Sequence, residues 1–379
     1  MKRVLMLASV ASMIDQFNMP NIVLLQKLGY EVDVACNFIE GNTCSDARVA
    51  ELKQKLQDMH VRCYQIDFAR NIRHMGQNMK ALWQVEGLMK QNTYAFCHCH
   101  SPIGGVVARI AGHRTRTKVI YTAHGFHFYQ GAPVMNWLVY YPVEKVLSRW
   151  TDVLITINHE DYARAKKKFH AGKTYYLPGI GINLERFHAG DTQTIQQKRQ
   201  ELGLQPEDVF LLSVGELSDR KNHVVVIEAM KQLVQRHPQL RYFICGQGEK
   251  KQELQQLIRK YHLEDHVKLL GFRTDVAELC QAADVFVFPS KQEGLPVALM
   301  EAMACGVPVV WGNTDLVKNG ENGYLVSADQ PEEYIQAIEK LLQIWKNTEE
   351  VRQMRKNNRA RIKQYSLQKI DKIMENIYR

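Results

Sequence analysis

Two glutamates separated by seven residues stand out in FPSKQEGLPVALMEAMACGVPVV, residues 288–310. The pattern places Glu293 in a loop after an apolar strand, and Glu301 one to two turns into a helix that Gly306 ends. Pro296 suits the first helical turn, where its missing N–H costs nothing. Carboxylates accept hydrogen bonds from the vicinal hydroxyls of ribose and hexoses, and the free amides of a helix N-terminus favour phosphate. The stretch predicts a site for a phosphate-linked sugar. The alternative, a solvated helix face, fits poorly with a helix otherwise made of Val, Ala, Leu and Met.

A second polar cluster, FCHCHSP at residues 96–102, raises the question of a metal site. The stretch has the composition of a buried strand, so Cys97 and Cys99 should point to one face and His98 and His100 to the other. Four adjacent strand residues cannot surround one zinc ion tetrahedrally, and no C-x-x-C or distant Cys/His pair completes a site. We therefore expect no metal here. His100 ends the strand, where parallel sheets bind ligands, and is expected to line a cleft.

Short β-branched or apolar runs alternate with segments of helical period along the chain, which predicts an α/β fold with two doubly wound parallel sheets. The break falls in LPGIGINLERFHAGDTQT, which is rich in Gly and turn formers. We expect domains at residues 1–178 and 179–350 and a basic helical tail at 351–379. The expected strands are Val4–Ala8, Val32–Ala35, Val61–Ile66, Ala95–Cys99, Lys118–Thr122, Val153–Ile157, Val209–Val214, Arg241–Cys245, Val267–Leu270, Val285–Phe288, Val307–Val310 and Tyr324–Val326.

The apolar run Val4–Val10 follows two basic residues and so imitates a short signal peptide. We interpret it as the first strand of an α/β domain, because the same pattern recurs further on at α/β spacing. No apolar stretch reaches the roughly 18 residues that a membrane-spanning helix needs. Without a secretion signal, the eight cysteines are expected to be reduced cytosolic thiols rather than a disulfide framework.

The formal charge of +9 is unevenly distributed along the 379 residues. Residues 1–178 hold 22 Lys and Arg against 13 Asp and Glu, residues 179–350 hold 18 against 25, and residues 351–379 hold 9 against 2. A basic first half and tail suit an anionic partner, either nucleic acid or a membrane surface with acidic lipids. A solvated surface without such a partner is the alternative.

The glycine pattern argues against a nicotinamide-dependent oxidoreductase, which needs G-x-G-x-x-G directly after a strand. The first strand is followed by SVASMIDQF, which contains no glycine. CGQGEK has two glycines and lacks the third, and GIGINL does not open a helix. The oxidoreductase class is therefore not expected.

The Glu293–Glu301 element resembles the E-x7-E signature of glycosyltransferase family 4. SVGELSDRKNH resembles the phosphate loop of that family's second domain, while HCHSPIGGVVAR and YTAHGFHFYQGAPVMNWLVYYPVEK resemble its exopolysaccharide-type, EpsD-like branch. The resemblance covers nearly the whole chain. It implies a GT-B fold: an acceptor-binding and a donor-binding Rossmann-like domain facing across a cleft, with a last helix that crosses back to the first domain.

Position by position, the resemblance implies that Glu301 binds the ribose hydroxyls of the donor. Glu293 would act as a catalytic residue that binds the hydroxyls of the donor sugar. The backbone amides of Gly294, Leu295 and Pro296 would lie near the sugar and the diphosphate.

The same comparison assigns the cations and the first-domain residues. Lys221 matches the family lysine that neutralises the diphosphate. The family usually has an arginine where this chain has Glu216, and Arg220 would replace it. His124 matches the catalytic histidine that reaches the reaction centre, and His100 lies on the acceptor side of the cleft. The loop SVASM lacks the family's glycine pair, which leaves acceptor contacts there open.

The resemblance implies a retaining transferase that moves a sugar from a nucleotide sugar, with a UDP-sugar as the expected donor. The expected acceptor is a polyprenyl-diphosphate-linked saccharide in capsular or exopolysaccharide biosynthesis. Negative charge develops on the departing diphosphate, and Arg220, Lys221 and a helix N-terminus would stabilise it. No D-x-D occurs in the chain, so neither a metal nor another cofactor is expected.

The stretch APVMNWLVYYPVEKVLSRW, residues 132–150, combines aromatic, aliphatic and basic residues. It is either a core helix or a surface that meets lipid. The second interpretation predicts a cytoplasmic protein attached peripherally to the anionic inner face of the cell membrane. Two further alternatives are a sugar-nucleotide epimerase on the same fold and a nucleic-acid-binding protein. The intact E-x7-E element argues against the latter, so no nucleic-acid partner is expected.

Overall fold

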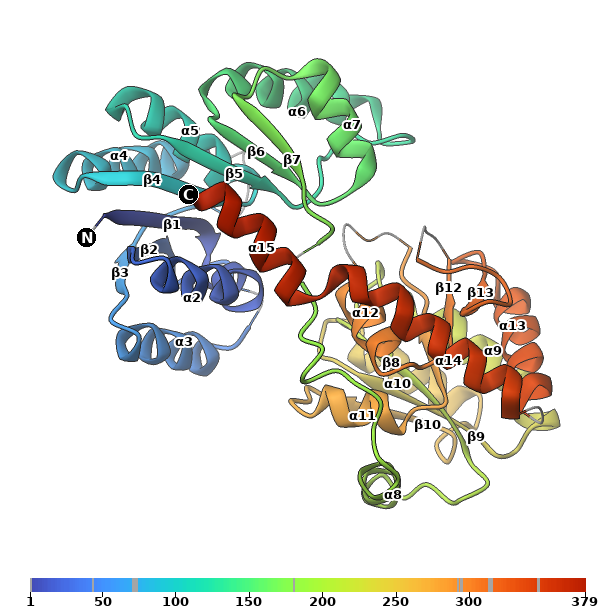
Figure 1. Cartoon of the computed structure of the whole chain (residues 1–379). Helices are drawn as coiled ribbons and strands as arrows, with labels where there is room; N and C mark the ends of the chain where they lie inside the picture. Colours follow the sequence, from blue (N-terminus) through green and yellow to red (C-terminus); the bar gives the residue numbers. More distant parts are fainter. Residues whose placement is uncertain are drawn as a thin grey trace. The chain divides into compact units, whose positions relative to one another are not determined.

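The computed structural model describes residues 2–42, 44–69, 74–179, 181–291, 293, 296–312, 316–345 and 348–379. The chain forms two compact units, shown in Figure 1. Unit 1 comprises Met1–Gly181 with Gln368–Arg379, and unit 2 comprises Ile182–Leu367. Each unit is a parallel sheet covered by helices on both faces, so the predicted fold class is confirmed.

Unit 1 contains a seven-stranded parallel sheet in the order β3-β2-β1-β4-β5-β6-β7. Apolar side chains of β1 face both layers, and helices α2, α3 and α15 cover one face while α4, α5, α6 and α7 cover the other. The strands are β1 (Arg3–Val10), β2 (Glu31–Asn37), β3 (Arg62–Gln65), β4 (Tyr94–His100), β5 (Val119–Ala123), β6 (Val153–Thr156) and β7 (Lys173–Tyr176). The helices are α1 (Ala11–Met13), a π-helical turn (Ile14–Asn18), α2 (Met19–Lys27), α3 (Asp46–Asp58), α4 (Met75–Gln91), α5 (Pro102–Thr115), α6 (Val134–Leu147), α7 (His159–Lys168) and α15 (Leu367–Tyr378).

Unit 2 contains a six-stranded parallel sheet in the order β10-β9-β8-β11-β12-β13. Helices α11 and α12 pack on one face, and α9, α10 and α13 pack on the other. The strands are β8 (Val209–Val214), β9 (Leu240–Cys245), β10 (Val267–Gly271), β11 (Val285–Phe288), β12 (Val309–Trp311) and β13 (Gly323–Leu325). The helices are α8 (Thr192–Glu201), α9 (His223–Arg236), α10 (Lys251–Lys260), α11 (Val276–Ala282), α12 (Val297–Ala304), α13 (Pro331–Trp345) and α14 (Thr348–Ile362).

Every strand expected from the sequence overlaps an observed strand. The run Val4–Val10 lies in β1, which pairs with both β2 and β4, so its interpretation as a strand is confirmed. β7 was not expected, because Lys173–Tyr176 has no aliphatic residue and lies at the sheet edge, where one neighbour suffices.

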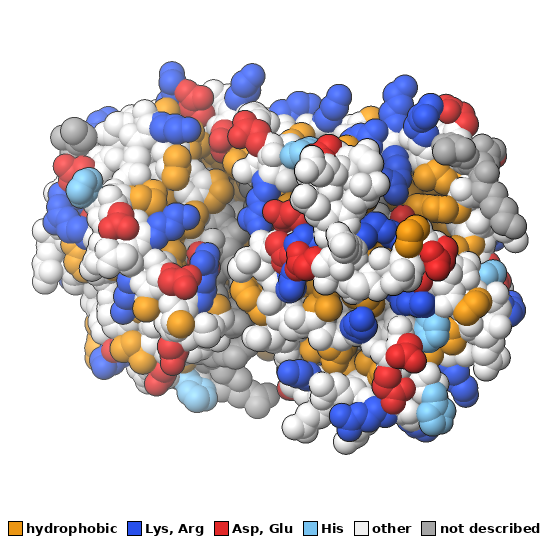
Figure 2. Space-filling view, turned by 90° about the horizontal axis from the view of Figure 1, so that it is seen from below, with side chains coloured by type: hydrophobic (Ala, Val, Ile, Leu, Met, Phe, Trp, Pro, Cys, Tyr) orange, Lys and Arg blue, Asp and Glu red, His pale blue; other side chains and the backbone are white. Residues whose placement is uncertain are grey.

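The basic tail contributes side chains to the cores of both units. In α14, Met354 and Ile362 are buried in the cores of unit 2. In α15, Ile370, Met374 and Tyr378 are buried in the core of unit 1. The helical segments that the structure describes include none with the length and apolar character needed to cross a bilayer. On the face shown in Figure 2, Lys and Arg side chains lie interspersed with Asp and Glu, so the net positive charge is not concentrated there.

Candidate functional site

The charged cluster of unit 2 lies where two neighbouring strands end. β8 and β11 pair directly, so the loops that follow them meet at one edge of the sheet. Arg220 Nη1 and Lys221 Nζ, from the loop after β8, lie 2.9 and 2.7 Å from Glu293 Oε1 in the loop after β11. Ser290 donates a hydrogen bond to the same carboxylate oxygen at 2.5 Å. Three of the predicted donor-site residues therefore share one ion cluster.

Burial shapes the electrostatics of this cluster. The Lys221 side chain is only 13% exposed and its Nζ lies 4.7 Å from the centre of the Phe288 ring. Desolvation lowers the pKa of Lys221, while attraction to the Glu293 carboxylate opposes the shift. An ammonium has three donors, and Lys221 uses one of them on Glu293. The hydrogen bonds from Arg220, Lys221 and Ser290 to Glu293 all go to the same oxygen, Oε1.

Glu216 stands where the resemblance calls for an arginine, and the structure shows what surrounds it. Its side chain is exposed, and it affects the pKa of Lys221 less than desolvation and the Glu293 carboxylate do. Arg220 instead contacts Glu293 directly. This placement supports Arg220 as the second cation of the cluster.

Two glycines hold the loop that carries Lys221 against the next strand. A side chain at Gly246 would collide with the backbone oxygen of Gly215, and one at Gly248 would collide with that of Leu217. The amide of Leu217 donates to Gln247 O at 3.0 Å. The glycines of CGQGEK are therefore explained by the close approach of two loops.

Glu301 lies in the second turn of α12, which starts one residue after Pro296. Pro296 thus occupies the N-cap, one position earlier than predicted. Gly306 ends the helix as predicted: its φ is +87°, and its amide donates to Met303 O at 2.9 Å. The predicted contacts of Gly294 and Leu295 lie outside the described residues.

The carboxyl group of Glu301 is desolvated. Burial raises its pKa to about 7, and the guanidinium of Arg186 opposes the shift. No described residue donates a hydrogen bond to this side chain. Glu301 is only half-buried, and a partly desolvated carboxylate without donors is costly, so the position favours a ligand that supplies hydroxyl groups.

The predicted residues of unit 1, His100 and His124, lie with His98 in a cluster of tilted imidazole rings at the carboxyl ends of β4 and β5. His100 ends β4 and is 2% exposed, and its Nδ1 lies 3.0 Å from Nε2 of His124, directly after β5. The His98 and His100 rings lie 4.2 Å apart. Burial lowers the pKa of His98 to about 3 and that of His124 to about 4, and it lowers the pKa of His100 strongly. These imidazoles are therefore neutral at physiological pH.

The alternation predicted for FCHCHSP is confirmed. Cys97 and Cys99 are buried in the core under α4 and α5, while His98 faces the opposite layer and its Nδ1 lies 2.8 Å from the Tyr378 hydroxyl. Within the described ranges, no group of three or more His, Cys, Asp or Glu residues is arranged to hold a metal ion.

The residues that support this imidazole cluster were not predicted from the sequence. His98 Nε2 lies 2.8 Å from the Thr122 hydroxyl, and Phe17 in the π-helical turn packs 5.5 Å from the His124 ring. Tyr378 lies 280 residues beyond His98, and no local pattern links the two. The contact between Ser290 and Glu293 could have been predicted, because the two residues are only three positions apart in the sequence.

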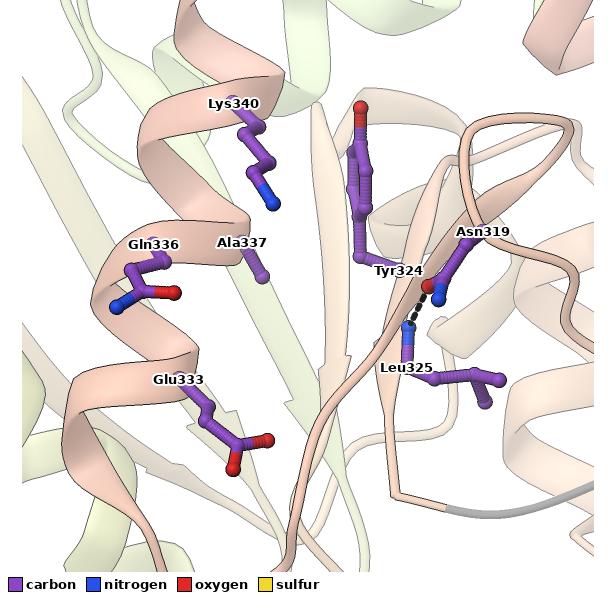
Figure 3. A pocket seen from close by; sticks show the side chains of 7 residues that line it. All are labelled: Asn319, Tyr324, Leu325, Glu333, Gln336, Ala337 and Lys340. Carbon is purple, nitrogen blue, oxygen red and sulfur yellow. Dashed lines mark hydrogen bonds between the residues drawn. The ribbon is translucent and has the colours of Figure 1, made fainter.

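A separate pocket of about 500 Å³ lies between β13 and α13 in unit 2 (Figure 3). Asn319 accepts a hydrogen bond from the Leu325 amide at 2.7 Å, and Lys340 lies over the Tyr324 ring. None of its seven lining residues belongs to the predicted site.

Two family models match this chain. The glycosyl transferase 4-like domain matches residues 21–178, and the glycosyl transferases group 1 model matches residues 194–361. The first match covers β2 to β7 of unit 1, and the second covers β8 to β13 of unit 2.

Relatives extend the similarity across both units. The chain is 37% identical over 348 residues to the putative glycosyltransferase EpsD of Bacillus subtilis, covering 90% of this chain and 87% of that one. It is 31% identical over 276 residues to the UDP-Gal:alpha-D-GlcNAc-diphosphoundecaprenol alpha-1,3-galactosyltransferase of Escherichia coli, covering 69% and 70%. The structure of Anabaena HepE in complex with UDP superposes with a TM-score of 0.78 at 21% identity, covering 100% of this chain and 99% of that one.

The two parallel-sheet units and these matches define a GT-B glycosyltransferase. The chain belongs to glycosyltransferase family 4, in the EpsD-like branch. The comparisons lend no support to the epimerase alternative.

Proposed function

We propose that the protein transfers a sugar from a UDP-sugar to a polyprenyl-diphosphate-linked saccharide, with retention of anomeric configuration, in exopolysaccharide or capsule assembly. The observation that carries the proposal is the Arg220–Lys221–Glu293 cluster, on the same sheet as the desolvated Glu301. Relatives that act on diphosphoundecaprenol-linked sugars support the acceptor class, and neighbours bound to UDP and UDP-glucose support the donor class.

In this proposal the two carboxylates bind different hydroxyl groups of the donor. The Glu301 carboxylate accepts hydrogen bonds from the ribose hydroxyls, which replace the water it loses on burial. Glu293 Oε2 accepts from the hydroxyls of the donor sugar, while Oε1 holds both cations in place.

Breaking the bond between sugar and phosphate leaves negative charge on the departing diphosphate. Lys221 and Arg220 are already held in position, so they stabilise that charge without reorganisation. We propose that this stabilisation needs no metal ion and no other cofactor.

On the acceptor side, His124 contributes a neutral imidazole. Its Nε2 is engaged by His100, which leaves Nδ1 to hydrogen-bond a sugar hydroxyl or the acceptor. A neutral ring adds no charge that would compete with unit 2 for the diphosphate.

The experiment combines a panel of UDP-sugars with a synthetic polyprenyl-diphosphate saccharide in EDTA. The expected product is the lipid-linked saccharide extended by one sugar, seen by mass spectrometry, with the donor's anomeric configuration by NMR. Loss of turnover in EDTA, restored by manganese, would contradict the metal-free mechanism. Conversion of the donor alone into an epimer would instead support the epimerase, and steeply salt-dependent binding to DNA would support a nucleic-acid role.

A further inference from the structure

Helix α6 exposes an apolar face on the surface of unit 1. Six of the thirteen large hydrophobic side chains exposed in the described part of the chain lie on this one helix, at 40% to 72% exposure. They recur at the spacing of one helical face, together with the exposed Pro142. The six are Val134, Met135, Leu138, Val139, Val143 and Val146.

The polar and aromatic side of α6 faces inward, which reverses the usual arrangement of a surface helix. Arg109 donates two hydrogen bonds to Glu144 at 2.7 and 3.1 Å, and both side chains are buried. Glu144 is the only acidic residue of α6. Separating a buried ion pair of this kind would leave an uncompensated buried charge, so the ion pair fixes the rotation of the helix and keeps the apolar face outward.

Aromatic contacts fix the same orientation against α7. Arg164 of α7 lies 4.9 Å from the centre of the Trp137 ring. Tyr141 packs 5.9 Å from Phe169, directly after α7. α6 and α7 therefore form one rigid surface element.

Basic side chains border one end of the apolar face. Lys145 and Arg149 are exposed at the C-terminal end of α6. The last turn of α7 carries three exposed lysines at positions 166–168. The amide of His170 donates to Ser148 Oγ at 2.9 Å, which brings the C-terminal ends of the two helices together.

A second apolar row lies in the same helical layer. Met75, Met79 and Trp83 of α4 are exposed at four-residue spacing, and α4 and α6 pack on the same core. Together the two helices carry nine of the thirteen exposed large hydrophobics in the described ranges, whereas Phe272 and Leu325 are the two in unit 2.

We propose that the outward face of α6 inserts into the interface of an anionic lipid bilayer, with Lys145, Arg149 and the lysines at 166–168 contacting the headgroups. The occupant is a membrane rather than a protein, because the exposed side chains of Val134–Val143 are all apolar, whereas protein interfaces make about one hydrogen bond per 100–200 Å². Aliphatic side chains bordered by basic ones match a bilayer interface with acidic lipids. The proposal rests on the proposed lipid-linked acceptor and assigns the surface that delivers the enzyme to it.

The test is co-sedimentation of the full chain with phosphatidylcholine vesicles, with and without 30 mol% phosphatidylglycerol (roughly a physiological anionic fraction). We expect the wild type to bind the anionic vesicles at least tenfold more tightly than the neutral ones. Added salt should reduce this difference, because it screens the charges. The triple variant Met135→Ser, Leu138→Ser, Val139→Ser should bind the anionic vesicles about tenfold or more weakly than the wild type. The matched control Phe272→Ser, Leu325→Ser, also exposed but in unit 2, should bind like the wild type.

Activity separates this surface from the active site. In the triple variant, transfer to a long-chain acceptor in vesicles should fall, while transfer to a short-chain water-soluble analogue stays unchanged. Unchanged vesicle binding of the triple variant would overturn the proposal. So would a wild-type dimer that ignores vesicles and becomes monomeric in the triple variant, because α6 would then be a subunit interface. Normal vesicle binding without turnover of any polyprenyl-linked acceptor would leave the surface assigned and refute the proposed acceptor.

Discussion

The two units share one architecture but differ at the edges where their strands end. In unit 1 the edge carries His100 and His124, whose desolvated imidazoles are uncharged at neutral pH. In unit 2 the corresponding edge carries Arg220 and Lys221 paired with Glu293. The same difference extends to the surface, because unit 1 exposes the apolar rows of α4 and α6.

This difference matches a division of labour in the proposed transfer. A nucleotide diphosphate is strongly anionic, and fixed cations lower its energy most where water is excluded. An acceptor sugar on a lipid is neutral at its reactive hydroxyl and needs orientation rather than charge. We therefore expect unit 2 to stabilise the charge of the diphosphate, and unit 1 to contact the acceptor and the membrane.

Replacing the cation of unit 2 should have the largest effect. In Lys221→Met the departing diphosphate loses its most buried cation, so the transfer rate should fall by about 10²–10³-fold, the range seen when one preorganised charge-stabilising group is removed. The measurement is kcat for sugar transfer at saturating donor. The matched control is Lys268→Met, an exposed lysine of β10 in the same unit, which should keep full activity. A loss below tenfold in Lys221→Met would contradict the assigned role.

Replacing Glu301 should have a smaller effect than replacing Lys221, seen in the affinity for the donor and in the pH dependence of that affinity. Removing a charged acceptor in Glu301→Ala should weaken nucleotide-sugar binding by about 1.5–3 kcal/mol. Because burial raises the pKa of this carboxyl to about 7, the free enzyme loses the carboxylate form as the pH falls. Donor affinity should therefore rise with pH, by about tenfold from pH 6 to pH 8 if only the carboxylate binds.

Calorimetry with a UDP-sugar serves as the readout, since its diphosphate diester does not titrate in that range. Glu301→Gln should flatten the profile. A pH-dependent affinity that persists in Glu301→Gln would assign the titration to another group.

The smallest effect is expected at the cysteines of unit 1. Cys97 and Cys99 face the core rather than the imidazole cluster, so Cys97→Ala with Cys99→Ala should change transfer by less than about twofold and lower stability by roughly 1–2 kcal/mol. Elemental analysis of the wild type should find no stoichiometric zinc. One zinc per chain, lost in the double variant, would show that the cysteines hold a metal after all.

The sheets were predictable because buried parallel strands appear as nearly continuous apolar runs. Runs such as Val209–Val214 and Val285–Phe288 carry that signal. β7 does not, because its sequence Lys-Thr-Tyr-Tyr contains no aliphatic residue; it forms at the sheet edge by pairing with β6. The meeting of Arg220 with Glu293, 73 residues apart, depends on β8 lying beside β11. Strand order is not encoded in local pattern, so this contact was expected only through the family resemblance.

Other parts of the site depend on packing that no local pattern specifies. The link from Tyr378 to His98 exists because α15 packs on β4. The outward orientation of α6 is set by a buried ion pair between α5 and α6 and by aromatic contacts with α7 and the residue after it. From the sequence alone, residues 132–150 fitted a core helix and a lipid-facing surface alike. The structure shows that six aliphatic side chains of α6 are exposed, while Trp137, Tyr140 and Tyr141 pack against the core. Contact of the exposed face with lipid stays a prediction.

Titration calorimetry of UDP in EDTA, with wild type, Lys221→Met and His124→Ala, tests the division of labour most directly. The account predicts metal-independent binding by the wild type, at least tenfold weaker binding by Lys221→Met, and binding within about twofold of wild type for His124→Ala, whose imidazole is neutral. Equal losses in the two variants, or wild-type binding that EDTA abolishes, would contradict it.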